Sequence, residues 1–262
     1  MINVEEIYAA ELDREQLINR NKYRNHEGWF SASSAGSCFK KLMLRREGKQ
    51  EPDMDKRVMR LLRLGTIVHE DFEKAFSLYN NNIYNKLIYN NINRDKKKNN
   101  KKEKQLEFLI EGELILDELN VRGFYDIVAQ QEEDGEERVY LYDLKTIASF
   151  AWSKSFGRDI TNDHENYKLQ LGTYGLAVKE QFGRLDGMYL YFYNKDTSAM
   201  KNVFVNDNYL GLARNYWRNI IREHKKGLPD FIPGISPVEK WACGYCDFKD
   251  HCNPPDYKNK VR

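Results

Sequence analysis

The chain has 262 residues, with 42 basic and 40 acidic side chains and a net charge of +2. Hydrophobic residues make up 41% of it and aromatic residues 13%, which excludes a disordered chain and predicts a globular protein with a substantial core. Because the charges nearly balance, any contact with nucleic acid must rest on local positive surface.

The sequence also bears on location. No run of about 18 apolar residues is present, and the acidic start, "MINVEEIYAAELDREQ", lacks the apolar region of a signal peptide. We therefore expect a soluble cytoplasmic protein with no membrane segment.

The first third of the chain is predicted to be helical. A polar helix is expected up to about Asn25, and Ser33 or Ser34 is a candidate N-cap for a short helix that stops at Gly48. Apolar residues then recur at helical spacing over 56–79. Gly65 interrupts this pattern, which favours a kink or two helices.

Residues 80–104 consist mainly of Asn, Lys, Tyr and Ile. Such a composition favours neither helix nor strand and predicts an insertion or loop. From Arg94 to Lys104 there are seven positive and two negative residues, a local charge of 7 − 2 = +5. A solvated loop and a contact with the DNA backbone are both open interpretations.

The remainder alternates between strand and helix patterns. Strands are expected within 114–130 and 138–148, a helix over 166–180, a hairpin from 187–195 and 202–207, and a helix over 209–226. The proline-bearing tail from Leu228 is expected to be irregular up to the cysteines. This order predicts one α/β domain with a mixed sheet.

The stretch "LYDLKT" places Asp143 and Lys145 on one face of a strand, with Leu144 pointing into the core. A carboxylate and an ammonium in this arrangement suit metal-dependent phosphodiester hydrolysis, although Mg²⁺ needs further oxygen ligands. Asp126, in "VRGFYDIV", is a candidate second ligand because an unpaired carboxylate entering a buried strand is costly.

Two further features lie on predicted helices. His69 follows Gly65, and by itself a helical histidine is more often a packed or surface residue. Gln170 and Tyr174, four residues apart, lie one above the other on a helix face. Neither feature is specific when taken alone.

The four cysteines are Cys38, Cys243, Cys246 and Cys252, and the last three form C-x2-C-x5-C. Without an export signal, two disulfides are a weaker interpretation than a metal or iron–sulfur site. Zn²⁺ accepts four thiolates, but the second close pair typical of zinc ribbons is missing. A 4Fe–4S cluster suits ligands gathered from separated segments, so the residues themselves leave a 4Fe–4S cluster and, as the alternative, Zn²⁺ open.

The ordered set G-T-x-x-H, G-x-x-D, D-x-K and Q-x-x-x-Y resembles the RecB-like branch of the PD-(D/E)XK nuclease superfamily. The cysteines resemble those of its iron–sulfur members, the CRISPR-associated exonucleases of the fourth Cas family and the AddB-type nuclease domains. The resemblance runs from Cys38 to Cys252. It departs from many relatives in having Asp rather than Glu in D-x-K, and 80–104 has no assigned counterpart.

The resemblance implies a restriction-endonuclease-like core and specific residue roles. Asp126 and Asp143 would be the metal-binding carboxylates, and Lys145 the lysine that activates water. His69 and the main-chain carbonyl of Leu144 would be further ligands of Mg²⁺ or Mn²⁺. Gln170 and Tyr174 would hold the DNA strand and steady the site; the four cysteines would hold the 4Fe–4S cluster.

The expected function is that of a metal-dependent DNA exonuclease acting on single-stranded or frayed ends. The resemblance favours digestion in the 5′-to-3′ direction. The expected context is CRISPR spacer acquisition or DNA recombination and repair. The alternatives are an assembly factor that binds DNA and CRISPR adaptation proteins, a phage or mobile-element recombination nuclease, and a zinc-stabilised nucleic-acid binder. The sequence leaves open whether the chain forms a homo-oligomer. The expected organisation is an N-terminal helical segment (1–55), a nuclease core (56–226) and a cysteine-rich segment (227–262).

Overall fold

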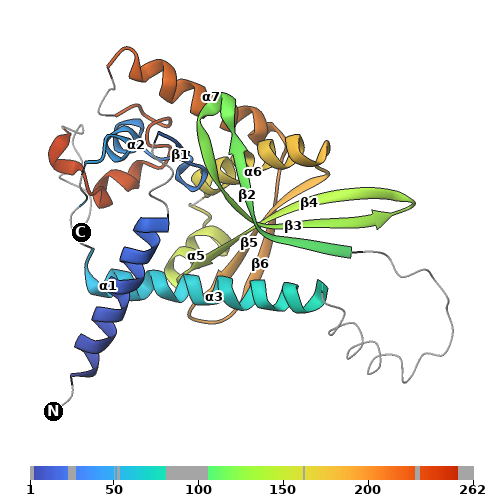
Figure 1. Ribbon diagram of the computed structural model, residues 1–262, viewed down its shortest axis with the longest axis horizontal. Coiled ribbons are helices and arrows are strands. Elements are labelled where there is room, and N and C mark those ends of the chain that lie inside the picture. Colours follow the sequence, from blue (N-terminus) through green and yellow to red (C-terminus); the bar gives the residue numbers. More distant parts are fainter. Residues whose placement is uncertain are drawn as a thin grey trace.

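The computed structural model describes residues 3–22, 28–49, 51, 54–80, 106–161, 163–227 and 231–252. Within these ranges the helices are α1 (Val4–Lys22), α2 (Phe39–Arg46), α3 (Lys56–Asn80), α5 (Ser149–Phe156), α6 (Glu165–Phe182) and α7 (Asn208–His224). The strands are β1 (Phe30–Ser31), β2 (Leu106–Leu116), β3 (Val121–Glu133), β4 (Glu136–Ile147), β5 (Gly187–Asn194) and β6 (Met200–Val205). Figure 1 shows their arrangement.

All six strands belong to one sheet with the order β1-β3-β4-β5-β6, and β2 pairs with β3 beside this path. β2, β3 and β4 are antiparallel neighbours, and β5 and β6 form the predicted antiparallel hairpin. β4 and β5 run parallel, as do β1 and β3. The predicted α/β fold with a mixed sheet is confirmed.

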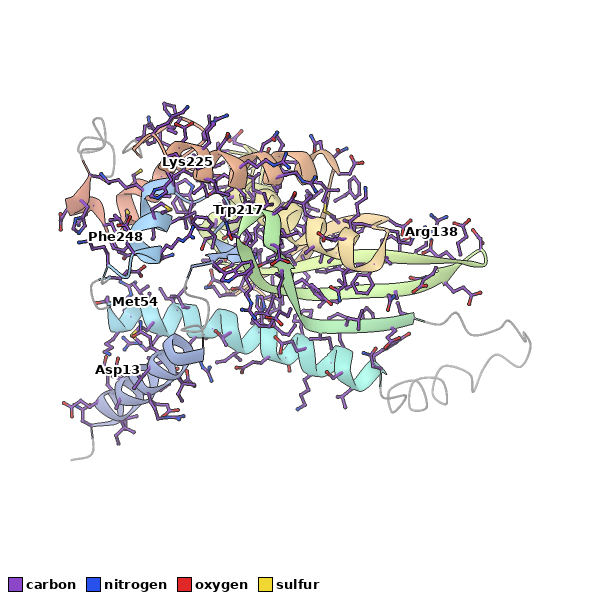
Figure 2. All side chains as sticks on the ribbon, turned by 45° about the horizontal axis from the view of Figure 1, so that its top comes forward. Asp13, Met54, Arg138, Trp217, Lys225 and Phe248 are labelled. Atoms are coloured by element: carbon purple, nitrogen blue, oxygen red, sulfur yellow. The ribbon has the colours of Figure 1, made fainter. Side chains whose placement is uncertain are left out.

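Helices lie on both sides of this sheet: α6 and α7 on one side and α3 along the other (Figure 1). The core between the sheet and α6 and α7 is centred on Trp217, which is fully buried and labelled in Figure 2. Its indole N–H donates a hydrogen bond of 2.9 Å to Thr173 of α6. Because a buried indole needs a partner for its N–H, this bond helps to set how α7 lies against α6.

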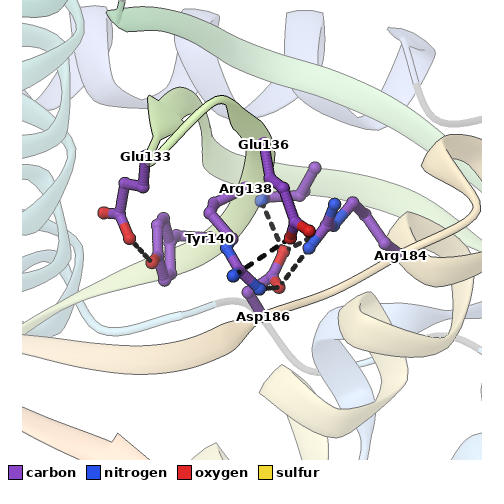
Figure 3. A network of polar contacts seen from close by, with 7 residues as sticks. Glu133, Glu136, Arg138, Tyr140, Arg184 and Asp186 are labelled. Carbon is purple, nitrogen blue, oxygen red and sulfur yellow. Dashed lines mark hydrogen bonds and ion pairs between the residues drawn. The ribbon is translucent and has the colours of Figure 1, made fainter. Parts of the chain in front are cut away.

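The parallel register of β4 and β5 is fixed at one end by an ion-pair cluster (Figure 3). Asp186, just before β5, accepts hydrogen bonds from Arg138, Arg184 and the main-chain N–H of Val139. The Arg184 guanidinium is the main cause that holds the pKa of Asp186 well below its usual range. Nearby, the Tyr140 hydroxyl donates to Glu133 at 3.1 Å. The cluster anchors β5 beside β4, which carries Asp143.

α3 corrects one prediction. It is a single helix from Lys56 to Asn80, so the kink or pair of helices expected at Gly65 is wrong. A glycine inside a helix costs only about 1 kcal/mol relative to alanine, and packing can outweigh that cost. Here Gly65 allows a close approach, because a Cβ atom on it would lie 2.9 Å from the Thr146 hydroxyl oxygen of β4.

The short N-terminal helix also begins later than expected. Ser33 and Ser34 lie in a 3₁₀ turn, and α2 starts at Phe39 with Cys38 as its N-cap, so the predicted serine cap is wrong. α2 ends at Arg46, and Gly48 follows in the left-handed conformation (φ 73°), in agreement with the predicted stop. Apart from Asn80, the predicted insertion 80–104 lies outside the described residues.

Candidate active site

The centre of the site is a fork between β3 and β4. The antiparallel ladder between these strands ends at the pair Ile127–Tyr142. Beyond it, β4 continues beside β5 while the start of β3 pairs with β2 and β1. Asp126 and Asp143 are the first residues past the last pair, so both carboxylates lie where the strands separate.

A hydrogen bond from the main chain of β4 to the Asp126 side chain of β3 connects the two strands at the fork. The N–H of Leu144 donates to Oδ2 of Asp126 at 2.7 Å. Leu144 itself is 4% exposed, in agreement with the prediction that its side chain points into the core. The bond replaces one rung of the lost ladder and fixes the position of Asp126 relative to β4.

Asp143 is fully buried, and neither of its carboxylate oxygens has a hydrogen-bond partner of good geometry. Lys145 Nζ lies 2.6 Å from its Oδ2, so the two form an ion pair although the contact lacks hydrogen-bond alignment. Burial, opposed by Lys145 and reinforced by Asp126, raises the pKa of Asp143 to about 7. A buried carboxylate whose oxygens accept no hydrogen bond is costly for folding even beside one ammonium group, so it indicates a site for a further cation.

The pKa values of Asp126 and Lys145 are both shifted by burial and by the charges at the fork. Burial raises the pKa of Asp126, although Lys145 and the Leu144 N–H oppose this. For Lys145, burial by itself would lower the pKa, but the Asp143 and Asp126 carboxylates outweigh it and raise the pKa. The lysine is therefore an ammonium ion at neutral pH.

His69 reaches the fork from α3. Its Nδ1 lies 3.7 Å from Oδ2 of Asp126. Burial first, and then the charge of Lys145, lower the pKa of His69, so the imidazole is neutral at pH 7. A neutral imidazole has the lone pair that a metal ligand requires. The structure thus brings His69 of α3 together with Asp126 of β3 and with Asp143 and Lys145 of β4.

Gln170 and Tyr174 come from α6. The Gln170 side-chain N–H donates to the Tyr174 hydroxyl at 2.6 Å, and both side chains are buried. Burial, with Asp143 and Asp126 as further causes, raises the pKa of Tyr174 well above its ordinary value. The pair therefore lies behind the carboxylates, while its predicted contact with DNA stays a prediction.

The oxygen and nitrogen donors at the fork determine whether it can hold a divalent cation. Among the described residues, no three His, Cys, Asp or Glu side chains already form a ready metal-binding group. The donor set at the fork nevertheless fits Mg²⁺ or Mn²⁺, because Asp143 offers two unsatisfied carboxylate oxygens in a buried position. Asp126 and a neutral His69 lie at the same fork.

The four cysteines meet at a second place. Cys38, Cys243, Cys246 and Cys252 all line one cavity of about 80 Å³, and they are thiols rather than disulfides. The Phe39 N–H donates to Ser236 at 2.7 Å, and the Val238 N–H donates to the Gly36 carbonyl at 2.9 Å. Burial, reinforced by the three other cysteines, raises the pKa of Cys243 to about 11. Four thiols that line one cavity fit thiophilic metal chemistry.

Tyr167 and His164 belong to the surroundings of Lys145, and no motif in the sequence singles them out. The Lys145 Nζ lies 5.2 Å from the centroid of the Tyr167 ring. The ring of His164 stacks on that of Tyr167 at 5.3 Å. The only sequence signal is the position of "HENY" at the start of a predicted helix.

A forked mixed sheet with two carboxylates and a lysine at the fork is the arrangement of a hydrolytic nuclease. The chain belongs to the PD-(D/E)XK nuclease superfamily, since the model of that family matches residues 32–253. The expected superfamily is thereby confirmed. No curated protein matches the sequence.

Two solved structures are similar. The crystal structure of SSO0001 is 14% identical, with a TM-score of 0.54, covering 94% of this chain and 96% of that one. The "Putative exonuclease" from Eubacterium rectale is 17% identical, with a TM-score of 0.45, covering 79% of this chain and 86% of that one. At its low identity, the likeness to SSO0001 concerns the fold alone. No helix within the described ranges has the length and apolar character needed to cross a membrane.

Proposed function

We propose that the protein is a metal-dependent DNA exonuclease that hydrolyses phosphodiester bonds at single-stranded or frayed ends in the 5′-to-3′ direction. The observation that carries this proposal is the state of Asp143, which is fully buried, accepts no hydrogen bond at either oxygen and forms an ion pair of 2.6 Å with Lys145. A protein that only binds DNA has no use for such a costly group.

The roles follow from this environment. Asp126, Asp143, His69 and the main-chain carbonyl of Leu144 would hold Mg²⁺ or Mn²⁺. The cation would neutralise charge on the scissile phosphate and make the attacking water more acidic. Lys145, whose pKa is raised, remains an ammonium ion and therefore orients the water or phosphate rather than removing a proton. Gln170 and Tyr174 steady the carboxylates from α6 and lie next to the path of the strand.

The cysteine cavity supports a 4Fe–4S cluster with a structural role, with Zn²⁺ as the alternative. Cys38 comes from the segment 1–55, and the other three come from the segment 227–262. A cluster there would join both segments across the nuclease core, 56–226. Iron–sulfur ligation together with a RecB-like core favours membership of the CRISPR-associated exonucleases and a role in spacer acquisition. The same residues also suit a nuclease of phage or mobile-element recombination.

The proposal is tested on single-stranded oligonucleotides blocked at the 5′ or the 3′ end, in Mn²⁺ and in Mg²⁺. We expect the 3′-blocked strand to be degraded and the 5′-blocked strand to resist. Cleavage of circular single strands would show an endonuclease instead. Binding of DNA with no cleavage in either metal would favour the assembly factor.

A further inference from the structure

Lys145 is held between two partners of different kinds. On one side lies the Asp143 carboxylate, 2.6 Å away, and on the other lies the face of the Tyr167 ring, with its centroid 5.2 Å away. The Lys145 side chain is only 14% exposed. A cation over an aromatic face is attracted to the negative face of the ring, most strongly where water is excluded.

The Tyr167 ring is itself fixed in place. The imidazole of His164 lies nearly parallel to it, with an interplanar angle of 12° and centroids 5.3 Å apart. Phe192, which is fully buried, packs against both rings at 4.7 Å from His164 and 6.3 Å from Tyr167. Phe192 is also the register partner of Lys145 between β4 and β5. The lysine and its aromatic neighbours thus share one packed unit.

A buried hydrogen-bond chain orients the imidazole. The Ser155 hydroxyl donates to the Ala151 carbonyl at 2.8 Å, and Ser155 Oγ lies 2.5 Å from His164 Nε2. Because the hydroxyl proton is already used, Nε2 must be the donor, which sets the tautomer of His164. The same bond excludes Ser155 as a nucleophile activated by His164.

The backbone at His164 is also unusual. It adopts the left-handed conformation, with φ 54° and ψ 41°, directly before α6. A non-glycine residue there costs about 1 kcal/mol or more and persists only when its surroundings hold it. The stack with Tyr167 and the bond to Ser155 supply such contacts. The left-handed backbone at His164 directs the imidazole against the face of the Tyr167 ring.

We propose that Tyr167 is a positioning residue for hydrolysis, which holds the Lys145 ammonium at the fork, and that the His164–Ser155 pair fixes the Tyr167 ring for this purpose. A lysine side chain is a flexible point charge with three donors and needs outside support to act from one position. A ring face gives that support and leaves N–H groups for water or phosphate. The catalytic part of this inference rests on the proposed nuclease function.

The first arm of the test varies the negative charge on the ring face and keeps the ring itself nearly the same size. Tyr167→Phe is followed by phenylalanines with one, two and three ring fluorines at position 167, which progressively weaken the attraction for a cation. We expect kcat to fall about tenfold from Tyr167→Phe to the variant with three ring fluorines. KM for a single-stranded oligonucleotide and the Mn²⁺ affinity should not change. A flat series in an active enzyme overturns the proposal.

The second arm does not depend on cleavage. In metal-free protein labelled with ¹³C at the lysine ε-carbon, the Lys145 ε-protons should be shifted upfield by the ring above them. The Lys145→Arg variant identifies this signal by its loss. Tyr167→Phe should keep the shift and Tyr167→Leu should remove it.

The two arms separate the possible failures. An unshifted Lys145 signal in the wild type overturns the proposed contact, whatever the activity. If the wild type does not cleave DNA, the nuclease function fails, and the NMR comparison still decides whether Tyr167 holds Lys145.

Discussion

The main-chain N–H of Leu144 donates a hydrogen bond of 2.7 Å to Oδ2 of Asp126, across the point where β3 and β4 separate. This bond lets the sheet open without losing the alignment of its two strands. As a result, Asp126 and Asp143 lie together at the end of the ladder.

The first prediction concerns metal binding. Mn²⁺ at about 100 times its Kd should stabilise the wild type by about 3 kcal/mol, because it binds only the folded chain. At one fixed Mn²⁺ concentration, the stabilisation should be larger at pH 8 than at pH 6. The reason is that the pKa of Asp143 is about 7, so protons compete with the metal below that value. Thermal unfolding with and without Mn²⁺ measures it.

Asp143→Asn should lose this stabilisation. Asp163→Asn is the matched control, because Asp163 is 76% exposed and pairs with Lys168 away from the fork. Equal Mn²⁺ stabilisation of Asp143→Asn and Asp163→Asn would remove Asp143 from the metal site.

The second prediction concerns the contact between α6 and α7. A Cβ atom on Gly172 would lie 2.3 Å from the main-chain oxygen of Tyr209, which neither helix can relieve by rotating a side chain. Gly172→Ala should therefore destabilise the fold by about 2 kcal/mol and displace α6, with a lower cleavage rate. Urea unfolding measures the stability.

Gly211→Ala in α7 is the control for helix propensity. A Cβ atom there would meet nothing within 4 Å. This variant should be more stable than the wild type by about 0.5–1 kcal/mol. If both variants gained stability, the close approach of the two helices at Gly172 would be wrong.

The third prediction concerns acid stability. Burial lowers the pKa of His164 to about 4, whereas the ordinary value is 6.5. Between these values the unfolded chain binds a proton that the folded chain excludes. The contribution of His164 is therefore complete above about pH 6.5, falls as the pH is lowered and levels off near pH 4.

The size of this effect is up to about 3 kcal/mol. His164→Gln cannot titrate, so the difference in unfolding free energy between wild type and variant should change over this pH range. Urea unfolding at steps from pH 4 to pH 7.5 measures the difference. A constant difference across the range would mean that His164 takes up its proton over the same pH range in the folded and the unfolded chain, and would contradict the lowered pKa.

The fourth prediction concerns the cysteines. Protein purified without oxygen should be brown, with broad absorbance near about 400 nm from thiolate-bound iron. Cys38→Ser or Cys243→Ser should remove the colour and lower the melting temperature, because the metal supports folding. Ser37→Ala, in the wall of the same cavity, should keep both. Colourless protein with one equivalent of zinc would replace the cluster by Zn²⁺ and leave the nuclease residues unaffected.

Local patterns in the sequence predicted most of the elements. Period-two alternation placed Asp143 and Lys145 on one face of a strand, and helical spacing located α6 and α7 within a few residues. The continuity of α3 was not predictable, because it depends on Thr146 of a distant strand packing against Gly65. Local signals also placed the start of α2 too early.

The surroundings of the site depend on long-range packing. The complete burial of Asp143 and the contact of Lys145 with the Tyr167 ring require α6 to lie across β4 and β5 in one particular register. No local pattern encodes that register. The convergence of Cys38 with the three C-terminal cysteines was expected from the number and spacing of these residues and from the family resemblance. All four line one cavity, and the metal or cluster that they would hold stays a prediction.

The rate at which Lys145→Ala cleaves a single-stranded oligonucleotide in Mn²⁺ tests the central claim most directly. Lys201→Ala is the matched control, because Lys201 also lies over an aromatic ring, that of Phe156 at 4.8 Å. Lys201 is on β6, which pairs with β5 at the outer end of the strand order, whereas Lys145 is on β4. We predict that Lys201→Ala cleaves at the wild-type rate and that folded Lys145→Ala is slower by at least about 100-fold. Cleavage by Lys145→Ala at the wild-type rate would contradict the assignment of this fork as the active site.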